Sequence, residues 1–117
     1  MQNSSKTVIF TDATCDGWQR TKGFANGLLS LVVVNGDKVD KYLFKKRIKD
    51  KWLRQFINRF EYEAIKKAKK MYPEAQVFSD SKIAVGWALR KSRFSSVEWI
   101  SREKNPAGHE LERLKKT

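Results

Sequence analysis

The sequence predicts an α/β domain built on a five-stranded mixed sheet, with strands and helices in the order βββαβαβα and the helices packed on the sheet. Asn35-Gly36 lies between two apolar runs and is the strongest short signal for a β-hairpin. A long amphipathic helical pattern follows within residues 50–72. Two short apolar runs, at 75–79 and 97–100, come after it and are separated by a second helical segment. Connections through helices make neighbouring strands parallel, so the sheet should be mixed.

Three strands open the chain as an antiparallel meander. We expect the first over residues 6–14, with a turn at 15–17 after it. The second should run from about residue 23 through residue 34, and the third from 38 to about 46. Their apolar residues recur mostly at alternate positions, as in strands with one buried face.

The long helix should end before Pro73, which cannot continue it. A helical wheel places its apolar residues on one arc, with Glu61 in the middle of that arc and Glu63 on a basic side. Glu63 is therefore expected to make ordinary surface ion pairs. Glu61 should face the core, where an isolated carboxylate is costly.

The remaining elements are short. After the strand at 75–79, a helix should span 81–90, capped by either Asp80 or Ser81. A loop at 91–96 leads to the last strand, and the final helix should begin near Pro106, because proline is favoured in a first helical turn. We expect residues 1–117 to form a single domain.

Composition indicates a polyanionic partner. The chain has 117 residues, with 25 Lys and Arg against 13 Asp and Glu, which gives a formal charge of +12. Such an excess attracts phosphates through steering and counterion release.

The single cysteine excludes an internal disulfide and fits a reducing compartment. There is no apolar run long enough to cross a membrane and no signal-peptide pattern, so we expect a cytoplasmic protein with no membrane association.

Three acidic residues stand out because their surroundings are apolar or small. Asp12 ends the first strand's apolar run, Asp80 ends the fourth, and Glu61 lies on the apolar arc of the helix between them. The carboxyl ends of parallel strands form the ligand-binding edge of an open α/β sheet, so one pocket can hold all three. Buried carboxylates need a charge partner or a metal, and this set suits hard divalent cations. Without metal, their repulsion should raise one pKa.

With these elements in place, the chain resembles the type 1 ribonuclease H family over nearly its whole length. The resemblance rests on four segments in the family's order: Phe10-Thr11-Asp12-Ala13-Thr14-Cys15, Asn58-Arg59-Phe60-Glu61-Tyr62, Ser79-Asp80-Ser81 and Trp99-Ile100-Ser101-Arg102-Glu103-Lys104-Asn105. The fold implied is RNase H-like. The activity implied is endonucleolytic cleavage of the RNA strand of an RNA–DNA hybrid.

The resemblance also implies a site with two divalent cations, Mg²⁺ or Mn²⁺, and no small-molecule cofactor. Asp12 would bridge the ions, with Glu61 and Asp80 on either side. Substrate contacts would come from Asn58 and from Asn105. The main chain near Ala13, Thr14 and Cys15, and Ser81 next to the third acid, would also contact substrate. For Asn58 the alternative is a helix-surface amide without a role. The expected partner is an RNA–DNA hybrid bound by a monomer.

The fourth acidic position of the family departs from the pattern. Four residues after Asn105 the chain has His109, and Glu110 comes next. We assign His109 to the site as a catalytic residue, acting by proton transfer or by holding a water, and we keep Glu110 as the alternative metal ligand. A further alternative is an exposed histidine without a role. The loop histidine of many family members is replaced by the stretch 102–104, and their additional basic helix is absent.

Other functions stay open at this point. A non-catalytic nucleic-acid-binding module on the same scaffold would explain a missing fourth carboxylate. A DNA-cutting nuclease of the resolvase or integrase type is also compatible with the fold. A basic interaction protein without a site would leave Glu61 unexplained, and it ranks last.

Overall fold

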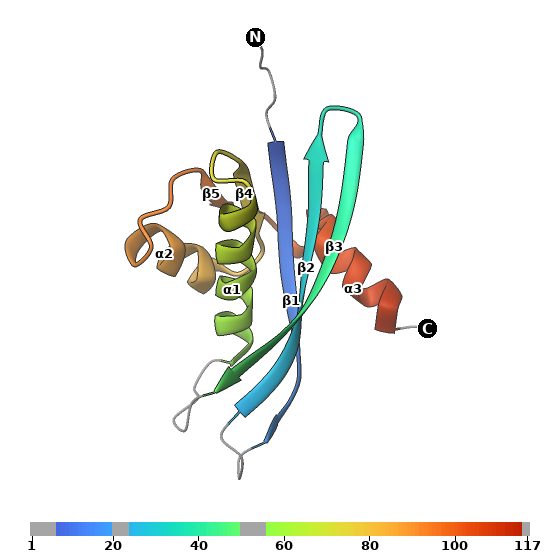
Figure 1. The fold of residues 1–117 in the computed structure, drawn as a ribbon, viewed down its shortest axis with the longest axis vertical. Helices are drawn as coiled ribbons and strands as arrows, with labels where there is room; N and C mark the ends of the chain where they lie inside the picture. Colours follow the sequence, from blue (N-terminus) through green and yellow to red (C-terminus); the bar gives the residue numbers. More distant parts are fainter. Residues whose placement is uncertain (1–6, 20–23, 50–55, 116–117) are drawn as a thin grey trace.

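A five-stranded mixed sheet forms the centre of the computed structural model, which describes residues 7–19, 24–49 and 56–115 (Figure 1). In chain order the elements are β1 (Thr7–Gln19), β2 (Phe24–Asn35), β3 (Lys38–Lys49), α1 (Phe56–Met71), β4 (Gln76–Ser79), α2 (Lys82–Arg90), β5 (Val97–Trp99), the short 3₁₀ helix η1 (Arg102–Lys104) and α3 (Pro106–Lys115). The strands lie side by side in the order β3-β2-β1-β4-β5. The predicted element order is confirmed, and η1 is an addition to it.

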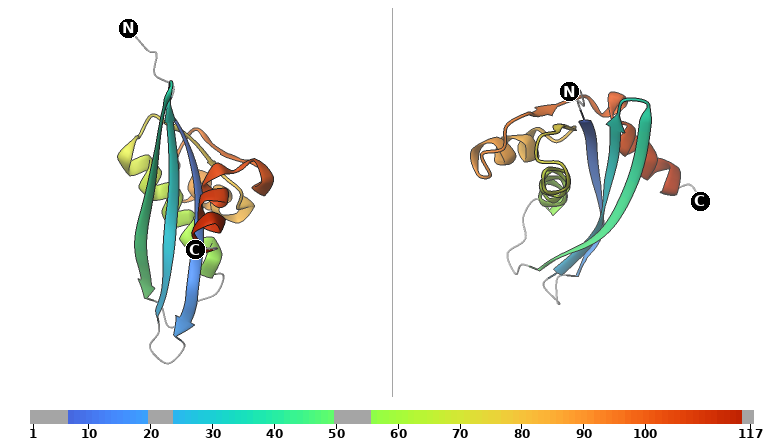
Figure 2. Two further views of the ribbon diagram at one scale, coloured as in Figure 1. Left: turned by 90° about the vertical axis from the view of Figure 1, so that its right-hand side faces the viewer. Right: turned by 45° about the horizontal axis from the view of Figure 1, so that its top comes forward.

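The meander is antiparallel, whereas β4 runs parallel to both β1 and β5. Helices α1 and α2 cover one face of the sheet and α3 lies on the other (Figure 1, Figure 2). The core lies mainly beneath α1, where Phe60, Ala64, Ile65 and Ala68 are completely buried. These residues belong to the predicted apolar arc. Ile57, in the first helical turn, is instead exposed.

The predicted turn at residues 15–17 is wrong. β1 continues to Gln19 and keeps pairing with β2, with a register shift between Cys15 and Gly17. The irregularity inserts one extra residue into β1, as in a β-bulge, so the chain bends without leaving the sheet. β3 is also longer than predicted. Its extension is stabilised by Ile48, which pairs with Ala25 across the ladder, and both side chains are buried.

The helix boundaries follow local capping. The Ser81 hydroxyl accepts a hydrogen bond from the Ala84 N–H at 3.1 Å, so Ser81 rather than Asp80 caps α2. α3 begins at Pro106 as predicted. Residues 50–55, part of the region within which the long helix was predicted, lie outside the described residues. Among the described helices, none has the length and apolarity needed to span a membrane.

Candidate active site

Unequal strand lengths bring the three acidic residues together. β4 pairs with β1 only as far as Thr11, opposite Ser79, where β4 ends, and the next residue in each segment is an aspartate. Asp12 and Asp80 therefore lie next to each other where β1 has no β4 neighbour. Glu61 reaches the same place from α1. One carboxylate oxygen from each of the three residues lies within 4.8 Å of the other two.

A buried asparagine holds this arrangement from the opposite face of the sheet. Asn105 precedes α3 and is completely buried. Its Nδ2 donates to the Thr11 carbonyl at 2.9 Å and to Asp80 Oδ2 at 3.1 Å, and its Oδ1 accepts from the Ala107 N–H at 3.1 Å. The amide thus ties β1, Asp80 and the first turn of α3 together. Asn105 has no surface open to a substrate, so it is a positioning residue rather than the substrate contact expected from the sequence.

Burial and mutual repulsion raise the pKa values of two of these acids. Asp12 is 8% exposed and Glu61 is 3% exposed. Burial is the largest cause in both cases, and it raises the pKa of Asp12 and raises the pKa of Glu61 to about 11. A hydrogen bond between the two side chains favours the proton on Glu61. The prediction that one carboxyl pKa would rise is confirmed. The predicted cause, repulsion between the acids, contributes, but burial of the carboxyl groups away from solvent is the larger cause.

The donor set fits a hard divalent cation. Oε1 of Glu61 is buried and has no hydrogen-bond partner within the described residues. A buried oxygen without a partner is costly, and it is expected where a ligand completes the site. Three converging carboxylates offer only oxygen ligands and a strongly negative local charge, which are the properties that Mg²⁺ and Mn²⁺ require. Asp12, Glu61 and Asp80 would hold such ions.

The acidic group lies in a hollow of about 330 Å³. The Ser81 hydroxyl donates to Asn58 Oδ1 at 3.2 Å, which fixes both polar groups on the wall of this hollow. Thr14 and Cys15, both half-buried, do not line it. Its lining consists of the three acids with residues from β1, α1, α2 and η1, namely Asp12, Ala13, Ile57, Asn58, Glu61, Asp80, Ser81, Lys82, Ile83 and Arg102.

The first turn of α3 approaches the acids through Gly108. A Cβ atom at this position would lie 2.9 Å from Asp12 Oδ2 and 3.9 Å from Asp80 Oδ2, so the helix backbone packs directly against the carboxylates. His109 is exposed. The Glu110 carboxylate forms ion pairs with Lys41, at 3.1 Å, and with Arg113. These contacts hold the pKa of Glu110 below its usual value, and they keep its carboxylate outside the group of three.

Two cations at the site were not identified as site residues from the sequence. Arg102 of η1 lines the hollow, and its charge favours the ionised form of Asp12. Lys82, at the start of α2, lies over the exposed ring of Trp99 at 4.8 Å. The Trp99 Nε1–H in turn donates to the Asp80 carbonyl at 3.1 Å. Basic residues are frequent throughout this chain, so only the tertiary structure distinguishes these two.

Solved ribonuclease H1 structures share this fold. Ribonuclease H1 from the halophilic archaeon Halobacterium salinarum matches with a TM-score of 0.59 at 18% identity, over 96% of this chain and 99% of that chain. LC11-RNase H1, isolated from compost by a metagenomic approach, matches with a TM-score of 0.52 at 19% identity over 91% of each chain. The LC11-RNase H1 structure in complex with an RNA/DNA hybrid matches with a TM-score of 0.52 at 17% identity, over 91% of this chain and 93% of that chain.

No protein-family model and no curated protein matches the sequence. The structural matches span nearly all of both chains, and they confirm the predicted RNase H-like fold. This chain shares with these proteins the arrangement of strands and helices, at 17–19% sequence identity.

Proposed function

We propose that this protein is an endoribonuclease that cleaves the RNA strand of RNA–DNA hybrids by two-metal-ion hydrolysis. The observation that carries the proposal is the group of three carboxylates, two of them buried, whose oxygens lie within 4.8 Å of one another. They lie beyond the paired ends of two parallel strands, where α/β sheets bind ligands. The formal charge of +12 favours a nucleic-acid substrate.

The three acidic residues would have different roles in holding the metal ions. When bound, two divalent cations supply an activated water and neutralise charge on the leaving oxygen of an in-line phosphoryl displacement. Asp12, on β1, is the residue that the resemblance gives as holding both ions, and in the metal-free site Glu61 is the acid whose side chain contacts both of the others. The proton favoured on Glu61 has to leave before both buried carboxylates can act as ligands, so metal binding should release protons.

Selectivity for RNA would come from the wall of the hollow. A protein distinguishes RNA from DNA by contacts to the ribose 2′-OH. The paired Asn58 amide and Ser81 hydroxyl offer polar groups on this wall for such contacts. Ile57 and Ile83, which are 45% and 44% exposed, line the same hollow and offer apolar surface to a sugar. Arg102 would contact a phosphate.

For the fourth position we propose His109. Glu110 would have to give up its ion pairs with Lys41 and Arg113 before it could reach a metal, and those contacts favour its present position. An exposed imidazole one residue beyond Gly108 can hold a water or transfer a proton.

The test is cleavage of a duplex labelled separately on each strand, with Mg²⁺ and with Mn²⁺. We expect the RNA strand of the hybrid to be cut internally, while the DNA strand and a DNA duplex of the same sequence stay intact. Asp12→Asn is the matched control, because it keeps the shape of the side chain and removes the bridging charge. Equal cleavage by the wild type and this variant would contradict the site assignment.

One observation favours a second candidate, a non-catalytic nucleic-acid-binding module. Within the described residues the acidic group has three carboxylates and no fourth. Binding of the hybrid without cleavage in either metal would establish this alternative. Cutting of the DNA duplex in preference to the hybrid would instead identify a DNA nuclease on the same fold.

A further inference from the structure

The outer side of β3 is an open edge of the sheet along the whole strand. β3 is the last strand on this side, and it pairs with β2 along its full length (Figure 1). No backbone group of the described residues bonds to its outer side. Alternate N–H and C=O groups of an edge strand point outward, so they can pair with another extended chain.

The side chains on one face of this edge fall into an apolar half and a cationic half. Side chains alternate along a strand, so Val39, Leu43, Lys45 and Arg47 share a face. Val39 is 55% exposed and Leu43 is 48% exposed, although both are aliphatic. Lys41, between them, already has an ion pair with α3. Lys45 and Arg47 have no ion pair with any acid that the structure describes, so their charges stay available.

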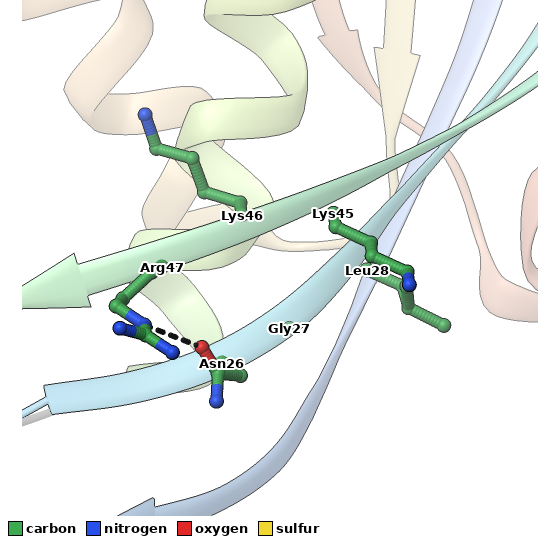
Figure 3. A pocket seen from close by; sticks show the side chains of 6 residues that line it. All are labelled: Asn26, Gly27, Leu28, Lys45, Lys46 and Arg47. Carbon is green, nitrogen blue, oxygen red and sulfur yellow. Dashed lines mark hydrogen bonds between the residues drawn. The ribbon is translucent and has the colours of Figure 1, made fainter.

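The cationic half borders a hollow of about 490 Å³ that is lined by β2 and β3. Lys45, Arg47 and Asn26 leave the two strands toward the same side, whereas Lys46 leaves toward the other (Figure 3). The Arg47 guanidinium is fixed in advance, because its Nε donates to Asn26 Oδ1 at 3.0 Å and it lies 4.4 Å from the centre of the Phe24 ring. The lining contains no acidic side chain. The hollow therefore suits the carboxylates of a partner.

Three features of the edge together decide what kind of chain can occupy it. β3 has six basic residues and one acidic residue, so pairing with a second copy would bring like charges together. A phosphate backbone has no N–H donors for the outward carbonyls, and it gains nothing from exposed aliphatic side chains. An extended acidic peptide matches the main-chain groups, the apolar half and the cationic half.

We propose that the outer edge of β3 is a docking site for an extended, acidic segment of another protein, which joins the sheet as a further strand. Main-chain hydrogen bonds to β3 hold the segment, as in other cases of β-strand addition. Its aliphatic side chains cover Val39 and Leu43, and its carboxylates pair with Lys45 and Arg47. None of these four residues lines the hollow that contains the acidic group, so the site goes beyond the proposed nuclease activity.

The test measures binding of a labelled peptide, acetyl-Glu-Thr-Glu-Thr-Val-Thr-Thr-Thr-Val-amide, and of its reverse sequence, since an edge accepts a strand in either direction. Fluorescence anisotropy with the full chain, in EDTA at physiological salt, should show binding of at least one of them. Lys45→Ala/Arg47→Ala should weaken it about ten-fold, because two exposed ion pairs are lost. Lys91→Ala/Arg93→Ala removes the same charges from exposed positions outside β3 and should weaken it less than about two-fold.

The apolar half and the strand pairing need their own variants. Val39→Thr/Leu43→Thr keeps residues that suit a strand and should weaken binding at least about five-fold. A peptide with proline in place of each threonine keeps the charges and the valines but lacks those N–H donors, and it should not bind. Amide hydrogen exchange should show added protection within Lys38–Lys49 on peptide binding, and none within Val97–Trp99 of β5, at the opposite edge.

Four outcomes would overturn the docking site. These are failure of both peptides to bind, equal binding of the proline peptide, equal weakening by the two charge variants, and protection of β3 by an RNA–DNA hybrid but by neither peptide. Protection that rises with protein concentration alone would identify a second copy as the occupant and would also overturn it. Absence of hybrid cleavage would contradict the proposed activity and leave the docking site standing, because neither probe nor measurement requires that activity.

Discussion

The metal-free protein should lose stability as the pH rises, and Glu61 should be the cause. The pKa of this residue is about 11 in the folded protein, against an ordinary value of 4.5. Above pH 4.5 the unfolded chain releases a proton that the folded protein keeps. The free energy of unfolding must therefore fall with increasing pH throughout the interval between the two pKa values.

The structure sets a ceiling on this effect. Asp12 and Glu61 share a hydrogen bond, so the pair is counted as holding one proton rather than two. One proton corresponds to at most about 1.4 kcal/mol per pH unit, or roughly 2.7 kcal/mol between pH 6 and pH 8. For a domain of this size that is a decrease of about 10 °C in melting temperature. Mg²⁺ or Mn²⁺ should restore more stability at pH 8 than at pH 6.

Glu61→Gln isolates the cause. The amide can still donate a hydrogen bond to Asp12, but it does not titrate, so most of the pH dependence should disappear. Thermal unfolding in EDTA, followed by circular dichroism at several pH values, measures both proteins. An identical pH dependence in wild type and variant, or a wild type that becomes more stable from pH 6 to pH 8, would refute the reasoning.

Three further predictions concern residues that surround the acids. Asn105→Ala should lower Mn²⁺ affinity by about 10–100-fold, as loss of supporting hydrogen bonds does at metal sites, and should cost about 1–3 kcal/mol of stability; titration calorimetry and urea unfolding measure the two effects. Gly108→Ala should weaken Mn²⁺ binding because its Cβ would press on Asp12 Oδ2, while α3 itself gains up to about 1 kcal/mol of helix propensity. Unchanged metal affinity would show that the approach of Gly108 is incidental. His109→Ala should slow cleavage more than Glu110→Gln does, and the reverse order in a kcat comparison would assign the fourth position to Glu110.

Much of the fold follows from local sequence signals. The hairpin at Asn35-Gly36, the end of α1 before Pro73 and the start of α3 at Pro106 each depend on residues within a few positions of the boundary. The errors arise where tertiary pairing overrides those signals. Cys15-Asp16-Gly17 is typical of a turn, but continued pairing with β2 makes it a bulge within a long strand.

The site likewise contains residues that the sequence reveals and residues that only the tertiary structure reveals. An acidic residue on an apolar arc or at a strand end is visible in the sequence because burial of its charge requires a reason. Arg102 carries no such signal, since a basic residue in a basic chain is unremarkable. The role of Asn105 could be inferred only as a substrate contact, because its three hydrogen bonds join segments up to 94 residues apart.

The short length of β4 is what makes the site possible. Had β4 continued beside β1 past Thr11, it would have covered the edge on which Asp12 meets Glu61. Because it stops there, α1 on one face and the first turn of α3 on the other reach the same point of β1. The acids are thereby held from both faces of the sheet before any metal binds. Preorganisation of this kind avoids rearranging the ligands on binding, but it stores the cost of a crowded, buried negative charge. That cost accounts for both the raised pKa of Glu61 and the expected stabilisation by divalent cations.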